Sequence, residues 1–298
     1  MSLVGLALTL GGCDGAPVSP SRTGPAAGPS GLPRAEVTPS QHQAQTPGRS
    51  AAAHPAPAPA AIRPAKPVAG SMDPAALTAQ KEYPRVRAAR RNTARAIEQL
   101  FARRGIRYPA HRLFIRVFKA DDRLELWAQP AADQPFKHLK NYPVCARSGR
   151  LGPKRRAGDR QVPEGFYHID RFNPASSYHL SLGLDYPNAS DKILSDPDRP
   201  GGDIFIHGDC RTIGCVPITD ELIEELYIIA LDSSETGRRV AVHVFPTRMV
   251  GEAWDALRQR ADPNALFWDN IRPGFLHFDQ QKRLPTFSVD SQGRYLFR

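Results

Sequence analysis

The stretch His207-Gly208-Asp209-Cys210-Arg211-Thr212-Ile213-Gly214-Cys215 sets an imidazole eight positions before a thiol that directly follows a glycine. A cysteine attacks as its thiolate, and a neighbouring histidine is the usual group that removes the thiol proton. The preceding residues Asp203-Ile204-Phe205-Ile206 alternate as in a strand, which puts Phe205 and His207 on one face. Because a strand end and one short turn supply both groups, we predict that Cys215 is a nucleophile and His207 its general base.

The turn before Cys215 also offers a place for the negative charge of an acyl-transfer intermediate. Attack on an amide carbonyl needs hydrogen-bond donors for the oxyanion and a proton for the leaving amine. The backbone amides of Gly214 and Cys215 are the candidate donors, and Gly214 lets a substrate approach closely. Two alternatives remain: Cys215 as a buried structural cysteine, and His179 or His243 as the base.

The N-terminal part of the 298-residue chain differs in composition from the rest. Residues 3–10 form an apolar run that is too short to span a bilayer, and Leu10-Gly11-Gly12-Cys13 resembles a bacterial lipobox, although no Lys or Arg precedes it. Residues 14–72 are rich in Pro and Ala and hold too few branched or aromatic side chains to form a core. We therefore predict a signal segment at 1–13 with a lipid on Cys13, and a disordered tether at 14–72. A frayed apolar start with a free thiol is the alternative.

A formal net charge of +10 raises the question of a nucleic-acid partner. Many basic residues fall in 73–105, where an apolar stripe at helical spacing runs through Val86, Ala89, Ala94, Ile97, Leu100 and Phe101. No recognition-helix, zinc-finger or RNP-type pattern accompanies them, so we predict a basic helical segment and no nucleic-acid partner. Anionic headgroups or wall polymers suit that surface, and a solvated helix face without a specific partner is the alternative.

Apolar alternation predicts a mainly β (α+β) domain with peripheral helices over residues 106–247. The clearest strands are 113–119 and 124–128, joined by a turn at 120–123, and others are expected at 140–148, 165–170, 203–207 and 239–245. Thr219 can cap a helix whose inward residues are Leu222, Ile223, Leu226, Tyr227 and Ala230. Residues 248–298 are expected to add one helix from Glu252 and an aromatic segment, Phe267–Phe278, that packs back on the core.

Several ordered segments resemble the catalytic domain of the L,D-transpeptidases, the YkuD or ErfK/YbiS/YcfS/YnhG family, and among them its YafK-like branch. The signature is His207-Gly208, then Thr-x-Gly-Cys at 212–215, then Val216-Pro217-Ile218-Thr219-Asp220. Further similar segments lie upstream, at Phe114–Lys119, Tyr142–Cys145, Gly152–Lys154, Gly158–Tyr167 and Tyr186–Ala189. The resemblance covers roughly residues 105–247 and implies an L,D-transpeptidase-like β-sandwich for the catalytic domain.

The resemblance implies a cysteine peptidyl transferase of the cell envelope that needs no cofactor. Its substrate would be the diaminopimelate-containing stem peptide of peptidoglycan, held as a thioester on Cys215. Many members carry a histidine directly before the Gly-Cys pair, where this chain has Ile213, so the acyl acceptor stays open between a diaminopimelate amine, a protein and water. Two alternatives are a hydrolase of the same fold that releases a wall-linked protein or peptide, and a non-catalytic wall-binding module anchored by a lipid.

The resemblance also implies roles for individual side chains. The carbonyl of Gly208 matches the group that orients the histidine in the family. Stem peptides carry carboxylates, so cationic side chains in family-like segments are candidate contacts, with an aromatic, an amide and a hydroxyl group beside them. These candidates are Arg147, Lys154, Arg160, Tyr167, Asn188 and Thr212. Ordinary surface charges or turn residues are the alternative for each.

The chain has four cysteines. With Cys13 lipidated and Cys215 catalytic, Cys145 and Cys210 remain as an even pair in an oxidising compartment, so a disulfide is possible although spacing does not establish it. A zinc site built from His207, Cys210 and Cys215, with His243, is the rival. Its His-x2-Cys-x4-Cys spacing is irregular for structural zinc, and we predict no metal.

Overall fold

The computed structural model describes residues 73–298. The predictions for Cys13 and for the tether at 14–72 lie outside the described residues. Within 73–298, no helix is long and apolar enough to cross a membrane.

Within the described residues, eight strands form a mixed sheet in the order β3-β2-β1-β8-β4-β5-β6-β7. The strands are β1 (Arg112–Phe118), β2 (Arg123–Gln129), β3 (Lys137–Pro143), β4 (Gly165–Asn173), β5 (Ser181–Leu184), β6 (Phe205–His207), β7 (Val216–Pro217) and β8 (Ala241–Phe245). The predicted first hairpin is present, because β1 pairs antiparallel with β2. The third strand begins earlier than predicted and ends at Pro143, and Cys145–Ser148 continue as a loop.

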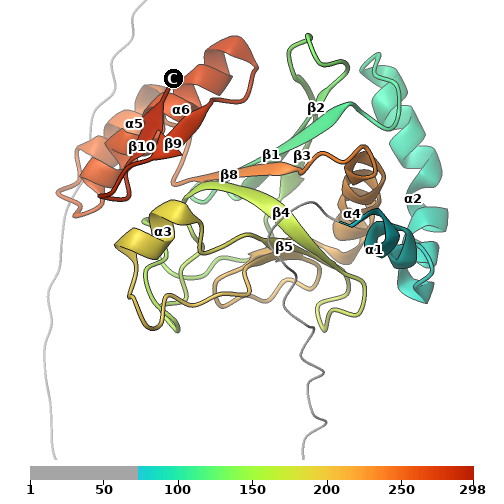
Figure 1. The fold of residues 1–298 in the computed structure, drawn as a ribbon, viewed down its shortest axis with the longest axis horizontal. Helices are drawn as coiled ribbons and strands as arrows, with labels where there is room; N and C mark the ends of the chain where they lie inside the picture. The colour runs from blue at the N-terminus through green and yellow to red at the C-terminus, as the bar shows by residue number, and fades with distance from the viewer. Residues whose placement is uncertain (1–72) are drawn as a thin grey trace, which may run out of the picture. The chain divides into compact units, whose positions relative to one another are not determined.

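Two helices cover one part of this sheet (Figure 1). They are α2 (Pro84–Arg103), preceded by the short α1 (Pro74–Gln80), and α4 (Asp220–Ser234). The predicted stripe of α2 is buried except at Ala94, because Thr93 takes the inward position and donates to the Ala89 carbonyl at 2.7 Å. Thr219 stands at the N-cap of α4, but its side chain makes no capping hydrogen bond to the helix backbone, which corrects the predicted cap.

The C-terminal residues form more structure than predicted. Instead of one helix and a packed segment, they contain α5 (Gly251–Arg258), α6 (Ala265–Gln281) and a hairpin of β9 (Phe287–Val289) and β10 (Tyr295–Phe297). The aromatic segment lies within α6, where Trp268, Ile271, Phe275 and Phe278 are buried at helical spacing. Gly274 lets α6 approach closely, since a Cβ there would lie 2.4 Å from the Phe297 ring.

These C-terminal elements pack against the sheet at a separate hydrophobic cluster. Phe118 at the end of β1 and Phe245 at the end of β8 are buried together with Trp268 and Phe275 of α6. The larger cluster, between the sheet and helices α2 and α4, contains Ile97, Leu226 and most of the other aliphatic core residues. Figure 1 shows α2 with α4 toward one end of the sheet and α5 with α6 toward the other. Along β8, Val242 and Val244 belong to the larger cluster and Phe245 to the C-terminal one, so the two groups of helices cover opposite faces of the sheet.

Candidate active site

The turn between β6 and β7 brings these two short strands side by side. These strands are parallel, with Ile206 opposite Val216 and His207 opposite Pro217. The residue before Val216 is Cys215, so the same register places the thiol level with Phe205, two residues before His207 on β6. The turn is fixed near its start, where the Asp209 amide donates to the Asp220 carboxylate of α4 at 2.8 Å.

The imidazole of His207 is held in one orientation. Its Nδ1 lies within hydrogen-bond distance of the Gly208 carbonyl oxygen, which can only accept, so Nδ1 carries the proton and Nε2 keeps a free lone pair. The ring of Tyr178 lies over it with centroids 4.7 Å apart. His207 is only 2% exposed, and this burial lowers the pKa of its imidazole. The ring is therefore neutral at pH 7 and able to accept a proton.

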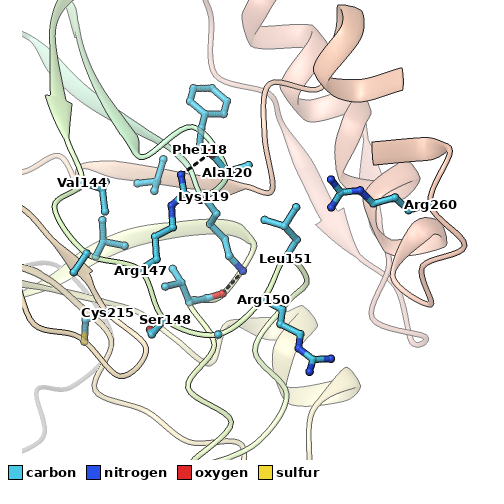
Figure 2. A pocket seen from close by; sticks show the side chains of 15 residues that line it. Phe118, Lys119, Ala120, Val144, Arg147, Ser148, Arg150, Leu151, Cys215 and Arg260 are labelled. Atoms are coloured by element: carbon cyan, nitrogen blue, oxygen red, sulfur yellow. Dashed lines mark hydrogen bonds between the residues drawn. The ribbon is translucent and has the colours of Figure 1, made fainter. Parts of the chain in front are cut away.

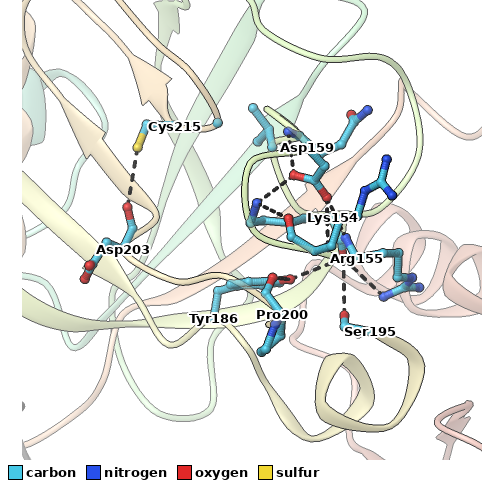
Figure 3. A network of polar contacts seen from close by, with 12 residues as sticks. Lys154, Arg155, Asp159, Tyr186, Ser195, Pro200, Asp203 and Cys215 are labelled. Atoms are coloured by element: carbon cyan, nitrogen blue, oxygen red, sulfur yellow. Dashed lines mark hydrogen bonds and ion pairs between the residues drawn. The ribbon is translucent and has the colours of Figure 1, made fainter. Parts of the chain in front are cut away.

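The thiol of Cys215 is half-buried and uncharged at rest. Burial raises the pKa of Cys215, while a hydrogen bond from the Phe205 backbone and the positive charge of Lys154 act against the rise. Its Sγ lies 3.7 Å from the Asp203 carbonyl oxygen (Figure 3). Among the described residues, the sulfur makes this contact and no hydrogen bond to the predicted base, His207. A neutral thiol donates to the carbonyl, whereas transfer to the imidazole requires the sulfur to turn away from Asp203.

The other two histidines that we considered as bases are occupied elsewhere. His243 is buried on β8 with its ring against Phe114 at 4.5 Å and Phe166 at 4.6 Å. His179 places its Nε2 2.8 Å from the Glu224 carboxylate on α4. Neither contacts the sulfur, which leaves His207 as the candidate base.

The predicted oxyanion donors are engaged in the resting structure. The amides of Gly214 and Cys215 donate to the Thr212 hydroxyl oxygen at 3.2 Å and 2.8 Å. The same hydroxyl donates to the Cys215 carbonyl at 2.9 Å. Thr212 therefore shapes the turn rather than standing free as a substrate contact. The two amides can donate to an oxyanion only after they release this hydroxyl oxygen.

The structure joins Cys145 to Cys210 in a disulfide, with the Cα atoms 5.3 Å apart. Cys145 lies in the loop after β3, and its amide also donates to the Pro217 carbonyl at 3.0 Å. The disulfide therefore ties that loop to the turn that carries Cys215. It also removes the Cys210 thiolate that the rival zinc site requires.

A cavity of about 340 Å³ opens beside Cys215 (Figure 2). Its walls combine apolar side chains from β1 and the loops with four cationic groups. The cationic groups are Lys119, Arg147, Arg150 and Arg260. Figure 2 shows Cys215 at one side of the cavity and Arg260 at the other, with Lys119, Leu151 and Arg150 between them.

Comparison with known proteins places this arrangement in a family. The model of the L,D-transpeptidase catalytic domain, YkuD, matches residues 114–242. Over 187 residues the chain is 33% identical to "Putative L,D-transpeptidase YafK" from Escherichia coli (strain K12), in an alignment spanning 62% of this chain and 73% of that protein. The chain belongs to the L,D-transpeptidase family.

Solved structures of low identity show similarity over part of the chain. One is the helical cell shape determining protein Pgp2 from Campylobacter jejuni, with 18% identity, a TM-score of 0.39, and coverage of 60% of this chain and 73% of that one. Another is Bd1075 from Bdellovibrio bacteriovorus, with 20% identity, a TM-score of 0.34, and coverage of 57% and 60%.

For this L,D-transpeptidase family member, the predicted basic contacts have different surroundings. Arg147 lines the cavity but pairs with the Asp122 carboxylate and donates to the Ala120 carbonyl at 2.9 Å. Lys154 is buried and bonded to Asp159 at 2.6 Å (Figure 3). Arg160 is exposed, with a φ of 58°, and is not among the residues that line the cavity.

Two predicted cleft-wall residues have structural positions instead. Tyr167 is fully buried, and its hydroxyl donates to the Asp191 carboxylate at 2.9 Å. Asn188 caps α3 (Ala189–Leu194), accepting from the Asp191 amide at 2.9 Å, while its own amide donates to the Phe166 carbonyl at 3.0 Å. In this structure, polar atoms of both side chains are therefore paired within the protein.

The family-like segments did not point to Arg150, Arg260 or Tyr178. Arg260 follows α5 and lies outside the residues 114–242 that match the family, so no motif pointed to it. Tyr178 stands directly before His179 in a loop whose spacing from His207 carries no pattern. Only their residue types could have pointed to them, since each is a large polar side chain without a motif around it.

Proposed function

We propose that this protein is a cysteine-dependent L,D-transpeptidase that acts on peptidoglycan stem peptides through a thioester at Cys215. The observation that carries the proposal is the Nδ1 hydrogen bond of His207 to Gly208. It fixes the tautomer in which Nε2 can accept a proton, on the strand whose parallel partner begins directly after Cys215.

In the first half-reaction the Cys215 thiol gives its proton to His207 Nε2, and the sulfur attacks the carbonyl carbon between diaminopimelate and the terminal D-alanine. The amides of Gly214 and Cys215 release the Thr212 hydroxyl oxygen and donate to the tetrahedral oxyanion instead. His207 then returns the proton to the leaving nitrogen, and the C–N bond breaks. D-alanine departs with a neutral amine, and the acyl group stays on sulfur.

In the second half-reaction an acceptor attacks the thioester. A diaminopimelate amine loses a proton to His207 as its nitrogen bonds to the carbonyl, and the proton passes to the leaving sulfur. A new amide forms and the thiol is restored. Water in place of the amine gives hydrolysis by the same steps, so the acceptor decides between crosslinking and release.

The test is reaction with a disaccharide tetrapeptide and with purified sacculi, followed by mass spectrometry of protein and products. We expect an acyl adduct on Cys215, release of D-alanine, and either 3–3 crosslinks or trimmed peptides. Cys215→Ala should abolish adduct and turnover, and His207→Gln should slow turnover by roughly 10²–10⁴-fold, as loss of a general base does.

The controls separate the assignments. His179→Gln changes a histidine that faces Glu224, so it should keep most of the activity. An adduct on any residue other than Cys215, or a near-wild-type rate for His207→Gln, would contradict the assigned roles. A protein that binds sacculi without changing them would instead be a wall-binding module.

We further propose that the chain works in the cell envelope, anchored by a lipid on Cys13, on the periplasmic side of a membrane. The sequence Leu10-Gly11-Gly12-Cys13 supports the anchor, and the composition of 14–72 supports a tether between it and a catalytic domain at 106–247. Cys13→Ala should move the protein from the detergent-extracted membrane fraction to the soluble or unprocessed fraction. Unchanged fractionation with an intact N-terminus by mass spectrometry would refute the anchor.

A further inference from the structure

We propose that Arg150 and Arg260 form a carboxylate-binding site in the cavity beside Cys215, and that this site holds a carboxylate of the acyl donor away from the scissile bond. The inference rests on the proposed function for the identity of the donor. It assigns a substrate contact to the C-terminal residues, outside the segment that matches the family.

The four cationic side chains of the cavity fall into two pairs. The side chain of Lys119 is only 7% exposed, forms an ion pair with Glu164 at 3.0 Å, and donates to the carbonyls of Gly152 and Val162 at 2.7 Å and 2.9 Å. Arg147 is paired with Asp122. Both therefore have their charge compensated within the protein, and they have little left to offer a ligand.

The guanidinium groups of Arg150 and Arg260 differ from that pair. Both line the cavity, and among residues 73–298 neither makes an ion pair or a side-chain hydrogen bond. Each group offers a planar set of N–H donors that matches a carboxylate. They are exposed at the rim, beside the apolar wall that includes Leu151 and Val162. An anion held there keeps one side against protein and one side in water.

The backbone beneath each guanidinium is fixed. The Arg150 amide donates to the Gln161 side chain at 2.9 Å, and two residues later the Gly152 amide donates to the Glu164 carboxylate at 2.7 Å. The Arg260 carbonyl accepts from the Asp262 amide at 2.9 Å in the turn after α5. Only the side chains remain to be ordered when an anion binds, which limits the entropic cost of binding.

The two segments are also held to each other. Glu164 accepts from the indole of Trp268 on α6 at 2.7 Å while it binds Gly152 and Lys119. At Gly152 the side chain of Asn264 packs so closely that a Cβ would lie 2.6 Å from its Nδ2. These contacts therefore fix the position of the loop with Arg150 relative to the C-terminal segment that carries Arg260.

The position of the site selects which carboxylate it binds. Cys215 and Arg260 stand at opposite sides of the cavity (Figure 2), so the group held near Arg260 is separated from the carbonyl under attack. The terminal D-alanine carboxylate departs with the leaving group. A donor stem retains carboxylates on its D-glutamate and on the side chain of diaminopimelate, and these are the groups that this site would bind.

The experiment compares donor tetrapeptides with free or amidated carboxylates at those two positions. It uses wild-type protein, Arg150→Gln, Arg260→Gln and the double variant. The matched control is Arg258→Gln, since Arg258 lies two residues away, pairs with Asp269 at 3.2 Å and does not line the cavity. Wild-type protein should bind the free acid about 10-fold more tightly than the amide, as for a hydrogen bond to a charged group.

In Arg260→Gln and Arg150→Gln the preference should fall severalfold, and in the double variant the two peptides should bind equally. The change should appear in KM with kcat nearly unchanged, because the carboxylate is bound alike before and during the reaction. Arg258→Gln should behave as wild type. Equal wild-type affinity for free and amidated peptides, or an equal loss in Arg258→Gln, would overturn the site.

Binding to the Cys215→Ala variant, measured by calorimetry, separates this proposal from the proposed function. A carboxylate preference in Cys215→Ala that depends on Arg150 and Arg260, together with no turnover by the wild-type protein, would support the site and refute the transferase. Turnover with no preference for the free acid would support the transferase and refute the site.

Discussion

Burial moves the pKa values of the two reactive side chains apart. It lowers the pKa of His207 and raises the pKa of Cys215, so the resting pair is imidazole and thiol rather than imidazolium and thiolate. Proton transfer must then accompany substrate binding or attack. This arrangement protects the sulfur from electrophiles that do not engage the site, because only the thiolate is nucleophilic.

The first prediction concerns the pH dependence of thiol alkylation. The rate with iodoacetamide should rise with pH toward a midpoint above 9, because the raised pKa of Cys215 keeps it protonated below that pH. Cys215→Ala gives the background rate. A plateau already reached below pH 7 would instead indicate a resting thiolate–imidazolium pair.

The second prediction concerns Tyr178, whose ring shields His207. Tyr178→Ala should let water reach the imidazole and raise the pKa of His207 toward 6.5, since desolvation is the main cause of its depression. The acid limb of kcat/KM should move to higher pH by the same amount. Tyr83→Ala, which removes a similarly exposed tyrosine before α2, is the control, and equal shifts in both variants would contradict the role.

At the scale of elements, strands with strong alternation could be predicted and their ends could not. The β1–β2 hairpin follows from apolar alternation around the turn at 120–123. The turn at 208–215 could be recognised by its residue types. The sequence could not show that its amides donate to the Thr212 hydroxyl. The sequence could not show that polar atoms of Tyr167 and Asn188 have partners within the protein, because a polar atom in a family-like segment looks the same whether it faces solvent or a buried partner.

The third prediction concerns β8 and its buried His243. Burial lowers the pKa of His243 well below 6.5, so below that pH the unfolded chain binds a proton that the folded chain does not. Stability should therefore be full above pH 6.5 and fall as pH decreases, with this residue contributing about 1.4 kcal/mol per pH unit until the folded pKa is reached.

The measurement is urea unfolding between pH 7.5 and 5. His243→Leu should show a shallower fall of the unfolding free energy than wild type, whereas His111→Gln, a half-buried residue before β1, should not. An unchanged slope in His243→Leu would contradict the linkage.

At the scale of the whole molecule, the C-terminal elements are part of the cavity rather than an appendage. Glu164 is fully buried and joins Lys119 of the cavity wall to Trp268 of α6. No sequence pattern predicted this junction, because its residues come from three distant segments and each looks ordinary alone. The aromatic spacing in 267–278 predicted only that the segment would pack on the core.

The fourth prediction tests that junction. Glu164→Ala leaves the buried ammonium of Lys119 unpaired and should lower the free energy of unfolding by about 3–5 kcal/mol. Glu252→Ala, on the exposed side of α5, should cost far less. The free energy of unfolding is measured with urea at pH 7.5. Similar losses in the two variants would show that Glu164 stabilises the fold no more than an exposed carboxylate does.

The disulfide between Cys145 and Cys210 sets a condition on how this protein is made and handled. The three cysteines of the described residues can pair in three ways, and only this pairing leaves Cys215 free. Oxidative maturation must therefore close one bond while sparing the third sulfur, and a mispaired chain would be folded in part but inert. A reductant added to protect the nucleophile would open the loop that holds it. Assays belong in non-reducing buffer, on protein matured in an oxidising compartment, with the free thiol counted before each measurement.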